Sequence, residues 1–455
     1  MLPKGRAAPI TRQSENMAKT TKTRWETRPL DSWQRCKELR MEAYREVTTA
    51  REDGFLIATG SVGDSVILPA GLGPYVHLGA EPYGAAVSAD PGLAQACTEA
   101  YEARGFARDT CAYFRNYLGS MYLDRYFTGG PFPKPDIIVQ THTCDTHSKW
   151  FQIVAEHYDM PFFGLDVMPG PSSGLGLDRR VSYLAEQLFD CIEWMERVTG
   201  REYQDELFIE AIHNECEAET LFAESCYLNQ SIPAPLDQKM LFTLYTPAAA
   251  FRYKKETADF YRMLRDEVND RVQDRIAAVP SERCRLLHDS QPPWFFLRLY
   301  RIMEQYGAVC VGSQYCFTFS NLILGDDERG VPGKTPRQMG LQLKTREDAV
   351  RFYAWKALSR PAWEGMFHSA SEKNRHVLTM VDQWHIDGVI IHLNRGCEGL
   401  AQNQLETRLA LLDADIPTMT YEGNMADKRE FDEAQVVDLL ESFMENLGLR
   451  KLEID

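Results

Sequence analysis

Three of the eleven cysteines in this sequence stand apart from the others by their neighbours. Cys111, Cys144 and Cys397 each lie at the expected boundary of a helix or strand, beside polar residues and an arginine, lysine or histidine. Thiolates are the soft ligands that iron–sulfur clusters require. Three thiolates would leave one iron open to water or substrate, and an open position distinguishes a catalytic metal site from a structural one. The three cysteines are therefore candidate ligands of a shared metal site.

The other eight cysteines lie within or beside apolar or helical sequence, where a thiol behaves as a small hydrophobic group. They are Cys36, Cys97, Cys191, Cys216, Cys226, Cys284, Cys310 and Cys316. None of the eleven forms a CxxC pair, which excludes zinc-ribbon and thioredoxin-like motifs. We expect an intracellular chain without disulfides.

Three histidines flank the candidate cysteines. His142 and His147 lie on either side of Cys144, and His392 precedes Cys397. They have two interpretations: strand or helix residues with satisfied ring nitrogens, or hydrogen-bond and proton donors beside a cluster. Both remain open at this stage.

Charged residues near the cysteines also have two interpretations. Arg115 and Arg395 could pair with carboxylates, or could offset the negative charge of a thiolate-bound cluster. Asp109 and Asp145 occupy positions typical of helix N-caps, and we expect them to cap the helices that follow.

Two strands should position the second and third cysteines. Residues 136–142 (DIIVQTH) and 387–393 (DGVIIHL) are short apolar runs rich in β-branched residues, and each precedes a cysteine and an expected helix. Ligands of open α/β sheets bind at the carboxyl ends of strands, and helix N-termini favour anions such as thiolates. The two strand-end thiols, about 250 residues apart in the chain, should face each other across a cleft between two α/β units.

The remaining pattern predicts an α/β fold, because strands alternate with helices. We expect two Rossmann- or flavodoxin-like parallel-sheet domains, with a helical N-terminal segment and a helical insertion. Further strands are expected at 55–60, 161–167, 285–287, 307–312 and 416–421, and helices at 32–50, 91–104, 179–199, 399–413 and 432–447. Residues 65–73 are expected to form a strand or turn, 79–84 a loop, and 202–279 helices alone. The expected divisions are a disordered tail (1–22), a helical segment (23–62), a first α/β domain (63–185), a helical subdomain (186–280) and a second α/β domain (281–455).

The composition and charge of the chain limit the classes of molecule that we expect it to bind. A formal charge of −16 argues against nucleic acid or an anionic membrane as the main partner. There is no apolar run near the roughly 20 residues of a membrane helix, and the first 22 residues lack a secretory signal. We therefore expect a cytoplasmic protein. It has no P-loop motif, so ATP is not expected to bind to this chain.

The motifs around the three cysteines resemble those of a known family. CAYFRNYLG begins at Cys111, QTHTCDTHSKW surrounds Cys144, and GVIIHLNRGC ends at Cys397, with IPTMTYEGNMAD following. This set resembles the 2-hydroxyacyl-CoA dehydratase/benzoyl-CoA reductase family from about Trp25 to the carboxyl terminus. RWETRPLDSW, LGAEPYGA and EARGFARDTCAYFRNYLGSMYLDRYFTGGPFPKPD are most similar to the larger, B-type active-site subunit of ATP-dependent class I benzoyl-CoA reductases.

The resemblance implies one 4Fe-4S cluster held by Cys111, Cys144 and Cys397, with one open site, in a cleft between the two α/β domains. It also implies a heterotetramer with a paralogous cluster-binding subunit and two ATPase subunits that share a 4Fe-4S cluster and receive electrons from ferredoxin. The implied reaction reduces benzoyl-CoA, or a substituted benzoyl-CoA, to a cyclohexa-1,5-diene-1-carbonyl-CoA in anaerobic aromatic degradation.

Two alternatives belong to the same family: a 2-hydroxyacyl-CoA dehydratase subunit, which removes water by a radical route, and an electron-relay subunit that binds no substrate. Dehydratases of the family tend to carry a glutamate just before the apolar stretch that reads SVILPAGLG here, and this chain has Asp64 and Ser65 there. A ring reductase has no hydroxyl to expel, so this departure favours the reductase. An α/β protein with incidental cysteines would contain no iron.

Overall fold

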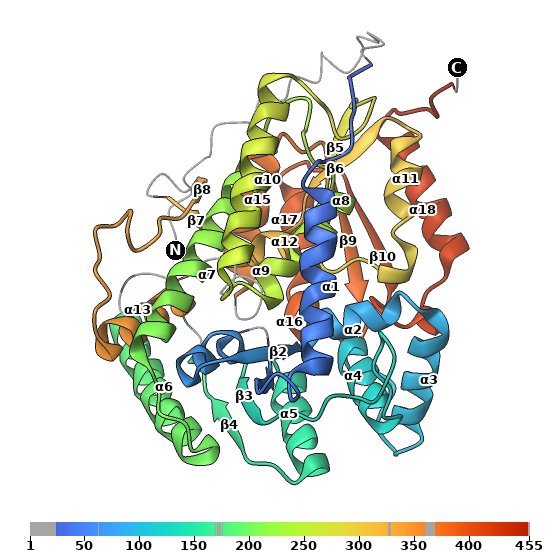
Figure 1. Ribbon diagram of the computed structural model, residues 1–455. Coiled ribbons are helices and arrows are strands. Elements are labelled where there is room, and N and C mark those ends of the chain that lie inside the picture. The colour runs from blue at the N-terminus through green and yellow to red at the C-terminus, as the bar shows by residue number, and fades with distance from the viewer. Residues whose placement is uncertain are drawn as a thin grey trace, which may run out of the picture.

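The frame of the molecule is a pair of separate four-stranded parallel sheets (Figure 1). The computed structural model describes residues 24–61, 63–168, 170, 174, 176–325, 329–359 and 369–453, without the side chain of Asp64. The first sheet has the order β2-β1-β3-β4, with β1 Leu56–Gly60, β2 Tyr75–Gly79, β3 Ile137–Thr141 and β4 Phe162–Leu165. The second has the order β10-β9-β5-β6, with β5 Cys284–Asp289, β6 Ala308–Gly312, β9 Gly388–Asn394 and β10 Thr418–Gly423. A short antiparallel pair, β7 Leu322–Leu324 and β8 Gly330–Pro332, completes the strands of the described residues.

The first sheet is covered on both faces, and its inner strand β3 is buried along its whole length. Ile137 and Val139 of β3 pack into one hydrophobic cluster, and Ile138 between them packs into another on the opposite face. The helices beside the first sheet are α2 Glu81–Ser88, α3 Pro91–Glu102, α4 Ala112–Tyr122, α5 Asp145–Tyr158 and α6 Leu177–Thr199. Local sequence starts some of them: Asp90 accepts hydrogen bonds from two backbone N–H groups of α3, and Pro91 is its first residue.

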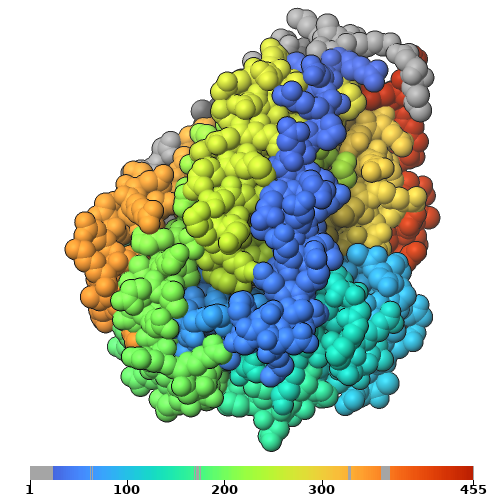
Figure 2. All heavy atoms as spheres, in the orientation of Figure 1, coloured from blue at the N-terminus to red at the C-terminus, as the bar shows by residue number. Residues whose placement is uncertain are grey.

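A helical part follows the first sheet in the chain. It comprises α7 Asp205–Leu228, α8 Gln238–Leu244, α9 Thr246–Ala250 and α10 Lys255–Gln273. The N-terminal helix α1 Trp33–Thr49 runs along the surface and contacts β2 of the first sheet as well as α9 and α10 (Figures 1 and 2). The remaining helices are α11 Leu299–Glu304, α12 Gln314–Thr318, α13 Arg346–Leu358, α15 Ala370–Gln383, α16 Glu398–Ala401, α17 Gln404–Asp413 and α18 Glu433–Asn446.

Most predicted elements are confirmed, including the α/β class, its parallel sheets and the strands before Cys144 and Cys397. Of the two alternatives predicted for residues 65–73, strand or turn, the strand is wrong, because this stretch forms the tight 3-10 helices η1 Asp64–Val66 and η2 Leu68–Leu72. The predicted loop at 79–84 is largely the start of α2, and the strand β2 before it was not predicted. Within the described residues, 202–279 contains helices and one isolated bridge residue, Ala277.

Segments that lie far apart in the sequence contribute to the first sheet and to the helices that cover it. Strand β1 forms where a strand was expected at 55–60, but it pairs with both β2 and β3, so it belongs to the first sheet although the expected helical segment included it. Helix α13 comes late in the chain, yet it packs against α6 in a cluster beside the first sheet. In the described part of the chain, no helix combines the length and the apolar character that would let it cross a membrane.

Candidate functional site

The three candidate cysteines occupy the same position in three different helices. Cys111, Cys144 and Cys397 are the N-cap residues of α4, α5 and α16, and none of the three thiols makes a side-chain capping hydrogen bond. The prediction that Asp109 and Asp145 are helix N-caps is therefore wrong. Helix α4 begins after Cys111, and Asp145 is already the first residue of α5. The thiols stand beside the backbone N–H groups of the first helical turn, which favour a negative charge.

The three thiols line one cavity of about 750 Å³, which includes open space at its mouth. Elements of both sheets form its walls: α4 and α5 beside the first sheet, and α12 and α16 beside the second. Its other lining residues include Glu81, Tyr113, Thr143, His147, Gln291, Tyr315, Phe319, Leu400 and Met425. The cavity is therefore part aromatic and apolar, with a few polar groups.

The cysteine thiols of this cavity suit a positively charged group as their ligand. Burial raises the pKa of Cys111 and of Cys397, and repulsion from the neighbouring thiols raises both further. A metal would remove this penalty, since its charge stabilises thiolates. Within the described residues, no three His, Cys, Asp or Glu side chains lie close enough to hold a single metal ion. A 4Fe-4S cluster would bind each thiolate through a different iron, so it does not require the three sulfurs to surround one ion.

Gly396 allows the loop before Cys397 to reach Cys111. Its φ of +73° is readily available to glycine, and a Cβ at this position would lie 2.5 Å from the carbonyl oxygen of Thr110. Thr110 directly precedes Cys111. The two cysteine-bearing loops thus pack backbone against backbone.

Of the three candidate histidines, His147 is the one that lines the cavity. Its Nδ1 is 3.3 Å from Cys144 Sγ and also contacts the Thr143 hydroxyl, while its Nε2 is 2.8 Å from Glu81 Oε1. Its ring stacks on Trp150. Burial opposes a charge on His147, but Cys144 and Glu81 outweigh burial and raise its pKa well above the ordinary value. His147 is thus suited to hold a proton beside the Cys144 sulfur.

The other two predicted histidines lie outside the lining of this cavity. His142 is half exposed at the end of β3, 3.6 Å from Asp145 and 3.8 Å from Asp166. His392 is fully buried in β9, where its Nδ1 lies 2.7 Å from the Gln291 carbonyl oxygen, and burial lowers its pKa to about 4. The structure thus brings together the cysteines and His147, but not His142 and His392.

Gln291 and Glu81 were not predicted from the sequence. Gln291 donates to Cys397 Sγ over 3.5 Å, and its Oε1 accepts from Asn394 and Ser290. Glu81 lies in the first turn of α2, which the turn-like sequence GAEPYG concealed. Pro82, the second residue of the helix, is the signal that could have indicated a helix start.

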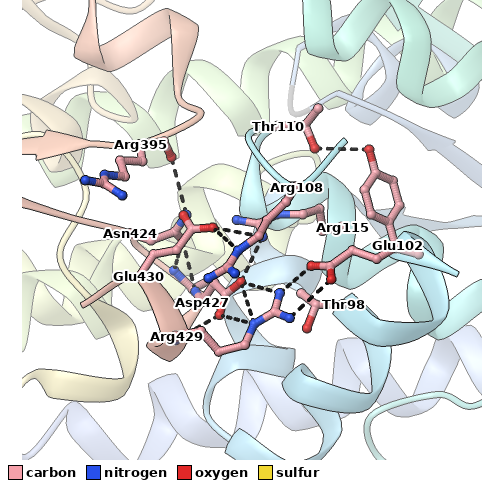
Figure 3. Close-up of polar contacts among 12 residues, drawn as sticks. Thr98, Glu102, Arg108, Thr110, Arg115, Arg395, Asn424, Asp427, Arg429 and Glu430 are labelled. Atoms are coloured by element: carbon pink, nitrogen blue, oxygen red, sulfur yellow. Dashed lines mark hydrogen bonds and ion pairs between the residues drawn. The ribbon is translucent and has the colours of Figure 1, made fainter. Parts of the chain in front are cut away.

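Arg115 and Arg395 both pair with carboxylates, which was one of their two interpretations. Arg395 forms a surface pair with Glu422 at 2.9 Å, and Arg115 is fully buried, 2.8 Å from Asp427. Figure 3 shows that the Arg115 pair belongs to a network of three arginines and three carboxylates. Its members are Glu102, Arg108, Arg115, Asp427, Arg429 and Glu430. The network joins α3 and α4, on either side of Cys111, to the segment that follows β10.

Comparisons with known proteins agree with the motifs. Residues 66–447 match the family described as 2-hydroxyglutaryl-CoA dehydratase, D-component. The (R)-phenyllactyl-CoA dehydratase alpha subunit of Clostridium sporogenes is 25% identical over 377 residues, which cover 82% of this chain and 84% of that protein. The (R)-2-hydroxyisocaproyl-CoA dehydratase alpha subunit of Clostridioides difficile is 23% identical over 91% of this chain and 95% of its own. The B subunit of benzoyl-CoA reductase from Thauera aromatica is 22% identical over 77% of this chain and 79% of its own.

Proposed function

The chain belongs to the 2-hydroxyglutaryl-CoA dehydratase D-component family, and from this we propose that it is the active-site subunit of an ATP-dependent benzoyl-CoA reductase. The observation that carries the proposal is the single cavity that three thiols share with aromatic walls. Thiols at three helix N-termini suit a cluster, and aromatic walls suit a flat aromatic acyl group.

In this proposal, Cys111, Cys144 and Cys397 hold a 4Fe-4S cluster with one open site. When bound, the cluster supplies single electrons to the acyl thioester. The chain's own residues prepare the site: His147, held by Glu81, keeps a proton beside the Cys144 sulfur, and Gln291 donates to the Cys397 sulfur. Such hydrogen bonds help to set the potential of a cluster. The aromatic rings of Tyr113, Tyr315 and Phe319 form part of the cavity wall and help to limit water around a charged intermediate.

One observation favours a reductase, and the benzoyl-CoA reductase B subunit among the relatives is compatible with it. Position 65, near which dehydratases of the family tend to carry a glutamate, is a buried serine whose hydroxyl donates to the Ser61 carbonyl and lies 3.1 Å from His77 Nε2. The side chain of Asp64, the other residue at this point, lies outside the described part of the chain.

The proposal includes partner subunits, because several relatives are named as alpha or B subunits. We place next to this chain a paralogous subunit that holds its own cluster, and two ATPase subunits that share a 4Fe-4S cluster, receive electrons from ferredoxin and bind the ATP. Ring reduction needs an electron of very low potential, which ATP hydrolysis by partners can provide.

A 2-hydroxyacyl-CoA dehydratase subunit is the second candidate. The relatives named as dehydratases reach 25% identity, against 22% for the reductase subunit. The cavity also contains a carboxylate, Glu81, close to the cysteines.

Substrate turnover separates the two functions. The complete complex, purified without oxygen and supplied with ATP and a strong reductant, should reduce benzoyl-CoA to a cyclohexadiene thioester and leave a 2-hydroxyacyl-CoA unchanged. Dehydration of the 2-hydroxyacyl-CoA with no effect on benzoyl-CoA would replace the first candidate by the second. If neither substrate binds to this chain, the electron-relay role would remain.

A further inference from the structure

Three tyrosine hydroxyls form a series that ends at the cavity. Tyr315 Oη lies 3.2 Å from Tyr245 Oη, and an electrostatic interaction between the Tyr315 and Tyr113 hydroxyls continues the series. The indole N–H of Trp294 donates to Tyr113 Oη. All three tyrosines are buried, and Tyr113 and Tyr315 line the cavity while Tyr245 does not. We call Tyr113, Tyr315 and Tyr245 the tyrosine chain.

The tyrosine chain has one more hydrogen than it can use internally. Three hydroxyls carry three hydrogens, and the two contacts between them can use at most two. The third hydrogen must therefore point away from the chain. On Tyr245 it would be buried without an acceptor, which costs free energy, whereas on a cavity-lining hydroxyl it can meet water or a ligand. The spare donor therefore faces the cavity.

Tyr113 is the better placed of the two cavity-lining tyrosines. It lies in the first turn of α4, two residues after Cys111. Its oxygen accepts from the Trp294 N–H, and Tyr315 can donate to the same oxygen. A hydroxyl whose oxygen accepts hydrogen bonds is polarised and becomes a stronger donor. Its hydrogen is then aimed at the space beside the cysteines.

The polar neighbours of Tyr113 are already engaged. His147 contacts Glu81, Thr143 and Cys144. The Gln291 amide donates to Cys397. Ser61 also lines the cavity and its buried hydroxyl has no hydrogen-bond partner among the described residues, so a ligand oxygen could meet a donor at Ser61 or at the tyrosine chain.

We propose that Tyr113 donates a hydrogen bond to the carbonyl oxygen of an acyl thioester bound in this cavity, an inference that rests on the acyl-CoA function proposed above. The carbonyl oxygen gains negative charge when an electron enters the conjugated acyl group, and a fixed donor stabilises that charge. The hydrogen stays on Tyr113, which makes no covalent bond. Removing one such donor lowers turnover by about 10²- to 10³-fold in other enzymes that stabilise an oxyanion.

Infrared difference spectra test this contact directly. Benzoyl-CoA and a 2-hydroxyacyl-CoA, each labelled with ¹³C at the carbonyl, are bound to the complete complex without ATP. A hydrogen bond lowers the carbonyl stretching frequency, so Tyr113→Phe should return it toward the frequency of the free thioester. The matched control Tyr83→Phe removes a buried hydroxyl outside the cavity, which contacts Ser120, and should leave the frequency unchanged. An unchanged frequency in Tyr113→Phe, or its return in Tyr315→Phe alone, would overturn the proposal.

A second variant covers the case in which Tyr113→Phe does not fold. Tyr113→3,5-difluorotyrosine keeps the shape and strengthens the donor, so the carbonyl frequency should fall further, and no change would count against the contact. The outcomes also separate this inference from the proposed function. If the predicted shifts appear but the complex dehydrates the 2-hydroxyacyl-CoA instead of reducing benzoyl-CoA, the donor stands and the reductase fails. If benzoyl-CoA is reduced and neither variant shifts the frequency, the reductase stands and the donor fails.

Discussion

Gly396 lies directly against the backbone of Thr110, so that a Cβ on Gly396 would approach the Thr110 carbonyl oxygen to 2.5 Å. This contact joins the loop before Cys397, which follows strand β9 of the second sheet, to Thr110, which precedes Cys111 and helix α4 beside the first sheet. The spacing of the two thiols therefore depends on a position where no side chain fits.

Gly396→Ala should destabilise the protein and separate the two loops. The cost has two parts: a positive φ of +73° for alanine, roughly 1 kcal/mol or more, and the clash with Thr110. Gly448→Ala is a matched control, because Gly448 has a φ of +78° and nothing within 4 Å of its Cβ position. Chemical unfolding should show a larger loss for Gly396→Ala, and its iron content should fall as well. Equal losses in the two variants would mean that the close approach does not matter.

Asp427→Asn should cost roughly 3 kcal/mol of unfolding free energy, because it leaves the fully buried Arg115 without its closest charge partner. Glu422→Gln breaks an ion pair of similar length between Glu422 and Arg395, and both of these side chains are more than half exposed. That variant should cost less than about 1 kcal/mol. The comparison is made by denaturant unfolding, and similar losses in the two variants would contradict a structural role for the buried network.

His376→Gln should make the protein less sensitive to acid. Burial, with help from Arg375, lowers the pKa of His376 from 6.5 to about 4, so the folded state keeps this group neutral. The unfolded state takes up the proton first as the pH falls below about 6.5, and stability is lost from there toward pH 4. Between these values, the slope of unfolding free energy against pH should be shallower in the variant by up to about 1.4 kcal/mol per pH unit. Identical slopes would show that His376 is not neutral and buried in the folded state.

The parts of the site that depend on local secondary structure could be predicted from the sequence. Cys144 and Cys397 follow short apolar runs, and such runs form the buried strands β3 and β9. A cysteine after each strand must then lie at the carboxyl edge of its sheet.

Contacts between distant residues could not be predicted in this way. Strand β9 is buried on both faces, so no alternation shows which way His392 points. Glu81 meets His147, and Arg115 meets Asp427, only through tertiary packing. The strand β2 was missed because Gly73 and Pro74 directly before it, and Gly79 at its end, resemble turn sequence.

The most direct test of the account is iron and sulfide analysis with EPR on protein purified without oxygen. The wild type should contain about four irons per chain, as one 4Fe-4S cluster requires, and Cys144→Ala should lose them. Cys36→Ala is the matched control, because Cys36 is a buried thiol whose pKa burial raises to about 12 and which lies outside the cavity. This control should keep both the iron and the EPR signal. Wild-type protein without iron, or a cluster that survives Cys144→Ala, would contradict the central claim.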